Sequence, residues 1–143
     1  MRAGAGAGIF HAALRRLWPI VAVTVAVVAG CGGDGTKTFE DPRGEISVES
    51  GEEFRIELSE NPSTGYFWRF RVRPDRSVVR YLGSEFELEP GGEDRAGAGG
   101  TRKLRFKAVM PGRTMMLLAN VFTGGERGRR PVAVRRIEVD VSG

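Results

Sequence analysis

The stretch EFRIELSENPSTGYFWRFRVR, residues 53–73, decides the fold class of this protein. Apolar and charged residues alternate strictly in its first part and again in its last part. Alternation with a period of two is typical of β-strands that bury one face and leave the other in water. The residues that this pattern turns inward are Phe54, Ile56, Leu58, Trp68, Phe70 and Val72. The stretch therefore predicts two half-buried strands separated by a short loop.

The loop between these two strands, ENPSTG, consists of turn-forming residues. Pro62 fixes its own φ and keeps Asn61 out of the helical region. The hydroxyl groups of Ser63 and Thr64 can bond to nearby backbone, and Gly65 tolerates a positive φ. Taken alone, these residues predict a rigid turn and no particular function.

The same alternation continues to the C-terminal end of the chain. EISVES, RKLRFKAV and VAVRRIEVDV each place apolar residues on one face, and RTMMLLANVF is expected to be covered on both faces for part of its length. The further residues expected to face inward are Ile46, Val48, Leu104, Phe106, Ala108, Ile137, Val139 and Val141. Seven to eight short strands separated by regular turn signals predict an all-β, antiparallel β-sandwich, with an immunoglobulin-like topology as the leading case.

The first 30 residues resemble a secretion signal. Three arginines and no acidic residue precede the apolar run LWPIVAVTVAVVAG, Leu17 to Gly30. This run is short for a membrane span and fits the apolar region of a signal peptide. It ends in VAGC, where two small residues before Cys31 resemble the lipobox of bacterial lipoproteins. The resemblance implies cleavage before Cys31 and lipidation of that cysteine, which would anchor the protein to a membrane.

Three other interpretations of this segment stay open: an uncleaved anchor, a plain signal with a chance cysteine, and a twin-arginine signal at Arg15–Arg16. Under the lipoprotein interpretation, residues 1–30 are the signal, 31–43 a Gly-rich flexible tether and 44–143 the folded domain. The domain is then expected in the cell envelope, lipid-anchored on the extracytoplasmic side of a membrane.

Charge and residue usage exclude several classes of function. Three of the 22 basic residues and none of the 18 acidic residues lie in the signal, so residues 31–143 have a net charge of +1. This balance predicts no nucleic-acid partner. The single histidine, His11, lies in the signal, and the single cysteine is Cys31. We therefore predict that the mature chain has no Cys/His or Ser/His nucleophile, no metal site and no cofactor, and that it is not an enzyme. We also predict that its hydrophobic core alone holds the fold together.

Two motifs follow each other in this all-β chain behind a secretion signal: NPSTGY, Asn61 to Tyr66, and GAGG, Gly97 to Gly100. Together they resemble the motifs of the chagasin family of cysteine-protease inhibitors. The first family motif is Asn-Pro-Thr-Thr-Gly-Phe/Tyr, which here reads NPSTGY from Asn61 to Tyr66 with Ser63 as a conservative departure. The second is Gly-x-Gly-Gly, which here reads GAGG from Gly97 to Gly100, directly before the strand TRKLRFKAVMPG.

The resemblance, which covers about residues 45–141, implies an immunoglobulin-like fold with three loops that enter the active-site cleft of papain-like (C1 family) proteases. The three loops are Asn61–Gly65, Pro90–Gly100 and Thr123–Pro131. The resemblance also implies that Thr64 lies at the catalytic cysteine and histidine of the protease, and that inhibition is reversible. The predicted protease-binding residues are Asn61, Pro62, Ser63, Thr64, Gly65, Tyr66, Gly97, Gly99 and Gly100. A monomer is expected.

The third family motif, Arg-Pro-Trp, is missing from its expected position. The chain there reads NVFTGGE, and the later Arg129–Pro131 is followed by Val132 where the family has tryptophan. We therefore carry no residue of the third motif over. Because that loop would supply contacts beside the cleft, a second function stays open: an envelope binding or structural module with the same fold and no inhibition.

Overall fold

Eight β-strands make up most of the part of the chain that the computed structural model describes, residues 35–124 and 130–143. They are β1 (Lys37–Glu40), β2 (Gly44–Glu49), β3 (Glu53–Glu60), β4 (Tyr66–Val72), β5 (Val79–Leu88), β6 (Gly100–Ala108), β7 (Gly112–Phe122) and β8 (Ala133–Ser142). A search of these residues finds no helix that is long and apolar enough to cross a membrane. The predicted signal and Cys31 lie outside the described residues.

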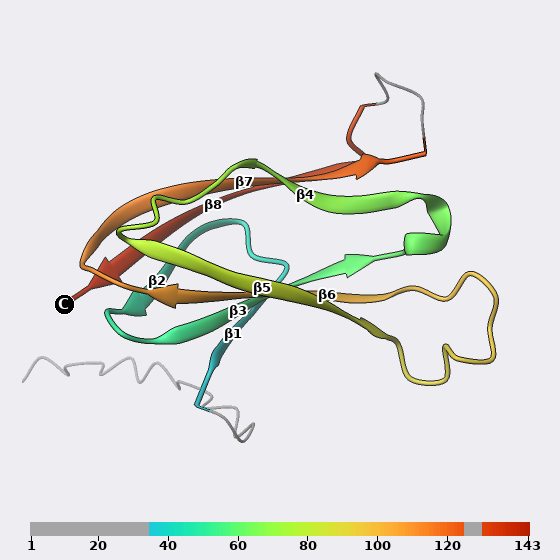
Figure 1. Ribbon diagram of the computed structural model, residues 1–143, viewed down its shortest axis with the longest axis horizontal. Coiled ribbons are helices and arrows are strands. Elements are labelled where there is room, and N and C mark those ends of the chain that lie inside the picture. The colour runs from blue at the N-terminus through green and yellow to red at the C-terminus, as the bar shows by residue number, and fades with distance from the viewer. Residues whose placement is uncertain (1–34, 125–129) are drawn as a thin grey trace, which may run out of the picture. The chain divides into compact units, whose positions relative to one another are not determined.

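The strands form two four-stranded sheets, ordered β1-β3-β6-β5 and β2-β8-β7-β4, which make two layers (Figure 1). The predicted immunoglobulin-like β-sandwich is confirmed. Of the six strand pairs in the described residues, four are antiparallel, whereas the edge strands β1 and β2 pair in parallel with β3 and β8. The two parallel pairs depart from the antiparallel pairing expected from the sequence, because a period of two shows which face of a strand is buried but not in which direction the strand runs.

Apolar side chains from both sheets meet in one core. Its buried members include Ile46, Val48, Phe54, Ile56, Leu58, Trp68, Leu104, Phe106, Ala108, Met116, Leu118, Ile137, Val139 and Val141. Phe106 stacks on Phe54 with ring centroids 5.2 Å apart and lies 5.5 Å from the ring of Tyr81. The predicted double coverage of the long strand β7 is confirmed, because the neighbouring residues Leu118 and Ala119 are both fully buried.

One expected core residue, Val72, faces solvent. Its exposed fraction is 40%, while Trp68 on the same strand is buried. The register of β4 on β7 shifts between Phe70, which pairs with Leu118, and Val72, which pairs with Leu117. A bulge adds one residue to one strand and reverses the face of every residue beyond it, and this explains the error in the prediction.

The assignment of residues 37–40 to a flexible tether is also corrected. These residues form β1, which pairs with β3 from Lys37↔Phe54 to Glu40↔Glu57. Phe39 packs edge-on against Phe54 with ring centroids 6.1 Å apart. One aromatic residue in a run of four is too short a pattern to predict a strand. Residues 37–40 form a strand because their backbone pairs with that of β3.

An ion pair joins the end of β1 to the opposite sheet. Arg135 on β8 donates from Nε to Asp41 Oδ1 at 2.5 Å and from Nη2 to Asp41 Oδ2 at 3.0 Å. This hydrogen bond from Arg135 is the main cause that lowers the pKa of the Asp41 carboxyl from its ordinary 3.8, with a smaller contribution from Arg43. Asp41 has a φ of +41°, a conformation that Asp and Asn tolerate better than most residues.

We expect Asp41→Asn to lower the free energy of unfolding at pH 7 by about 0.5 kcal/mol, a small value because the carboxylate is half exposed. Since the pKa is lowered on folding, the stabilisation is present above the unfolded pKa and disappears as the pH falls through the folded value. Urea unfolding at pH 7 and at about pH 2 measures this. A difference between variant and wild type that persists unchanged at the lower pH would contradict the assignment.

Three connections lie at one end of the sandwich, the right-hand end in Figure 1. Loop A is Asn61–Gly65 between β3 and β4. Loop B is residues 89–99 between β5 and β6. Loop C is residues 123–132 between β7 and β8, of which 125–129 lie outside the described residues. The connections from β4 to β5 and from β6 to β7 lie at the opposite end, as alternate loops of a sandwich should.

Candidate functional site

Loop A is one turn of 3-10 helix, Pro62–Thr64, with a capped start. Asn61 Oδ1 accepts from the backbone N–H of Ser63 at 3.1 Å and from its hydroxyl at 2.6 Å. The Thr64 hydroxyl donates to the Asn61 carbonyl at 2.6 Å, and the Thr64 N–H bonds to the same carbonyl at 3.2 Å. The loop therefore satisfies its own polar groups, while the side chains of Ser63 and Thr64 stay exposed at the tip.

Gly65 ends this turn in a conformation that requires glycine. Its φ is +76°, and its N–H donates to the Pro62 carbonyl at 3.0 Å. A Cβ at this position would lie 2.8 Å from the ring of Phe122. The sequence argument for a positive φ at Gly65 is thus confirmed, and the ring of Phe122 adds a packing reason that the sequence did not reveal.

Loop A is bonded to loop C through Gly65. The carbonyl of Gly65 accepts from the N–H of Thr123 at 2.9 Å and from its hydroxyl at 3.2 Å. Beneath them, the rings of Tyr66 and Phe122 lie 5.3 Å apart. Thr123 is the residue at which loop C begins to differ from the family's third motif. Even this altered loop therefore begins in contact with loop A.

Loop B folds as a series of tight turns. The N–H groups of Gly92, Arg95 and Ala98 bond to the carbonyls of Glu89, Gly92 and Arg95 respectively, and Gly97 has a φ of +81°. The Arg95 guanidinium lies 2.7 Å from a Glu89 carboxylate oxygen. Successive hydrogen bonds therefore order the loop that carries most of the GAGG motif.

Loops A and B lie against each other. Asn61 Nδ2 donates to the carbonyl of Gly97 at 3.0 Å, so the side chain that caps loop A also holds loop B. A Cβ on Gly97 would lie 3.7 Å from the Ser63 hydroxyl oxygen, and one on Gly99 would lie 3.5 Å from the Glu60 carbonyl oxygen. The structure thus brings together the two motifs that the sequence separates by more than 30 residues.

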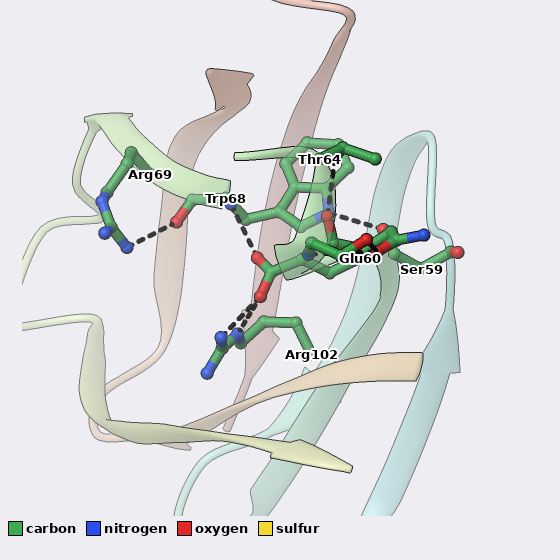
Figure 2. Close-up of polar contacts among 8 residues, drawn as sticks. Ser59, Glu60, Thr64, Trp68, Arg69 and Arg102 are labelled. Carbon is green, nitrogen blue, oxygen red and sulfur yellow. Dashed lines mark hydrogen bonds and ion pairs between the residues drawn. The ribbon is translucent and has the colours of Figure 1, made fainter. Parts of the chain in front are cut away.

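The base of loop A contains a buried carboxylate (Figure 2). Glu60 is 2% exposed. Its Oε1 accepts from Arg102 Nε at 3.0 Å and from Arg102 Nη2 at 2.5 Å, and its Oε2 accepts from the Trp68 N–H at 2.8 Å. Trp68 Nε1 donates in turn to the Ser59 carbonyl at 2.9 Å.

A second ion pair fastens the root of loop B. Lys103 on β6 donates to Glu87 on β5, and this hydrogen bond is the main cause that raises the pKa of Lys103. Glu87 lies two positions before loop B and Lys103 four positions after it, so the strands that carry loop B are held together near the point where it leaves the sheet.

Sequence reasoning missed three residues of this site: Glu60, Arg102 and Phe122. A signal for the first two was present. Glu60 lies two residues after Leu58, and Arg102 lies two residues before Leu104, so each shares the inward face of its strand with that leucine. Each is therefore a charged residue on a face that should be apolar. Two opposite charges at such positions, each next to a predicted loop, indicate a buried ion pair.

All nine predicted protease-binding residues lie at the loop end, on loops A and B or on the first residues of β4 and β6. Their contact with a protease stays a prediction. Within residues 35–124 and 130–143, no group of three or more His, Cys, Asp or Glu side chains is placed to hold a metal ion.

The fold and the site together define a class of protein: a β-sandwich that presents ordered loops at one end. A sequence profile described as "Chagasin family peptidase inhibitor I42" matches residues 47–134. The chain belongs to the chagasin family, a family of peptidase inhibitors and not of enzymes. Comparison with curated proteins gives no match.

Solved structures share the fold at low sequence identity. The cysteine protease inhibitor EhICP2 from Entamoeba histolytica has a TM-score of 0.63 and 19% identity, covering 75% of this chain and 96% of its own. PbICP-C, solved in complex with falcipain-2, has a TM-score of 0.54 and 15% identity, covering 78% and 95%. Amebosin has a TM-score of 0.50 and 18% identity, covering 75% and 98%.

Proposed function

We propose that this protein is a reversible inhibitor of papain-like cysteine proteases that occludes the active-site cleft with loops A and B. Family membership supports the inhibitor class, and PbICP-C, which shares the fold, was solved with a cysteine protease. The observation that carries the proposal is the hydrogen bond from Asn61 to Gly97, which joins both family motifs in one ordered surface.

The geometry of loop A supports occlusion without cleavage. A protease substrate presents an extended backbone, whereas Pro62–Thr64 is a 3-10 turn whose carbonyls at Asn61 and Pro62 are already bonded within the loop. Because the loop is ordered before binding, little conformational entropy is lost in the complex. Thr64 at the tip would then fill the space beside the catalytic cysteine and histidine.

Titration of papain and a cathepsin L-type enzyme tests the proposal, with a serine protease as control. Residues 36–143 contain all the described strands and suit this experiment. We expect stoichiometric loss of cysteine-protease activity and no effect on the serine protease. A folded domain that leaves both cysteine proteases active at micromolar concentration would overturn the proposal.

The alternative is an envelope binding or structural module without inhibition. Its support is the third loop, where the sequence Thr123–Glu126 stands in place of the Arg-Pro-Trp motif and residues 123–132 include no aromatic residue. The titration above separates the two functions, since only the inhibitor consumes protease activity.

We also propose that the protein is a monomer held in the cell envelope by a lipid on Cys31. The VAGC sequence after an apolar run supports this location, and two or more acyl chains suffice for stable anchoring. The test is membrane fractionation of the wild type and of Cys31→Ser, together with labelling by a radioactive fatty acid. Equal labelling and equal membrane retention of both chains would contradict it.

A further inference from the structure

A buried ion pair lies beneath loops A and B, where the core would otherwise end in apolar side chains. Glu60 is almost completely buried, and the Arg102 side chain is 20% exposed. Removing a carboxylate from water is costly, and replacing a buried ion pair by apolar residues of similar volume is often neutral or stabilising. Stability alone therefore gives no reason for this pair.

The contacts of Glu60 reach three loop roots. Glu60 itself is the last residue before loop A, and Trp68, whose N–H it accepts, lies three residues after the loop. Arg102 lies two residues after Gly100, at the end of loop B. One carboxylate thus holds both ends of loop A and one end of loop B.

The bond to Trp68 has a further consequence. β4 is the edge strand of its sheet, so the Trp68 N–H that points to Glu60 has no neighbouring strand to receive it. Glu60 supplies the acceptor from the opposite sheet. The bond therefore links the two sheets at the point where loop A crosses from one to the other (Figure 2).

We propose that Glu60 and Arg102 are positioning residues that set the angle between loops A and B, and thereby the fit of the loop surface to the protease. This inference rests on the proposed function. Arg102 donates two hydrogen bonds to one oxygen of Glu60, and the Trp68 N–H donates one to the other oxygen. These three bonds specify the direction as well as the distance at which the loop roots meet. Apolar side chains would fill the same volume without specifying either.

The test is the double variant Glu60→Met/Arg102→Met in the full-length chain. We expect it to fold with a denaturant midpoint close to that of the wild type, because removing the buried charges offsets the loss of the acceptor for the Trp68 N–H. We expect hydrogen exchange in peptides covering loops A and B to speed up about tenfold, and the inhibition constant to weaken about tenfold through faster dissociation. Arg102→Lys keeps the positive charge but loses the two-pronged guanidinium. Its loop exchange rate and its inhibition constant should lie between those of the wild type and those of the double variant.

The matched control is Arg113→Met/Asp140→Asn. This pair joins β7 and β8 at the end opposite the loops, with Nη2 and Oδ2 2.9 Å apart. Its loss should leave loop exchange and inhibition unchanged. A folded Glu60→Met/Arg102→Met variant with wild-type loop exchange and wild-type inhibition would overturn the inference.

The two readouts separate this inference from the proposed function. If the wild type inhibits no cysteine protease, the proposed function fails, but the exchange measurement still reports whether the ion pair orders loops A and B. If the wild type inhibits and the double variant inhibits equally well with unchanged exchange, only the positioning role fails.

Discussion

Replacing Thr64 by arginine is expected to weaken inhibition of papain-like proteases by at least about 100-fold, or about 2.7 kcal/mol. Thr64 lies at the exposed tip of loop A, where a long charged side chain would enter the protease cleft and lose its hydration without a partner. The fold should be retained, because the Thr64 side chain is exposed and its hydroxyl bonds to the Asn61 carbonyl within the loop itself. Inhibition constants and thermal unfolding of the purified variant measure the two effects.

Thr64→Ser is the matched control for this variant. It keeps the hydroxyl that donates to the Asn61 carbonyl and removes only a methyl group. We expect its inhibition constant to lie within about fourfold of the wild type, since burial of one methyl group is worth about 0.8 kcal/mol. Wild-type inhibition by Thr64→Arg would show that loop A does not enter the cleft.

Gly100→Ala is expected to lower the free energy of unfolding by about 2–3 kcal/mol. A Cβ on Gly100 would lie 2.1 Å from the Glu87 carbonyl oxygen and 2.8 Å from the Phe86 ring. The carbonyl belongs to the paired backbone of β5, so it cannot move without opening the sheet. Chemical denaturation at equilibrium measures the loss.

Gly99→Ala provides the comparison within the same motif. Its Cβ would meet the Glu60 carbonyl oxygen at 3.5 Å, an ordinary contact, and Gly99 has no positive φ. We expect the free energy of unfolding to change by no more than about 0.5 kcal/mol, because the fold does not require glycine here. We expect weaker inhibition, because a close approach of the backbone to the protease would require glycine at this position. Equal inhibition by Gly99→Ala and wild type would remove Gly99 from the binding surface.

These two glycines show that the GAGG motif has two separate requirements. Gly100 is needed by the sheet, where strand β5 passes too close for a side chain. Gly97 is needed by the loop, because its φ is +81°. Neither reason applies to Gly99, so only that position points to a partner. The sequence presents the four residues as one motif, and only the tertiary structure separates their roles.

The alternation of apolar and charged residues was sufficient to predict the sandwich and most of its core. Phe54, Ile56 and Leu58 are buried as expected, and so are Ile137 and Val139. This part of the fold is local information, because successive residues of a strand face opposite sides whatever their partners are. The turn at loop A was also predictable, since Pro62 and Gly65 restrict the backbone by themselves.

Tertiary structure alone decided the features that depend on strand pairing. β1 exists because the backbone of residues 37–40 pairs with β3, and Val72 faces water because a bulge shifts β4. Neither event leaves a periodic trace in the sequence. Likewise, Glu60 and Arg102 lie 42 residues apart, and their pairing follows from the register of β3 on β6. Sequence determined what each residue prefers locally, whereas the packing of the two sheets decided which loops and charges meet.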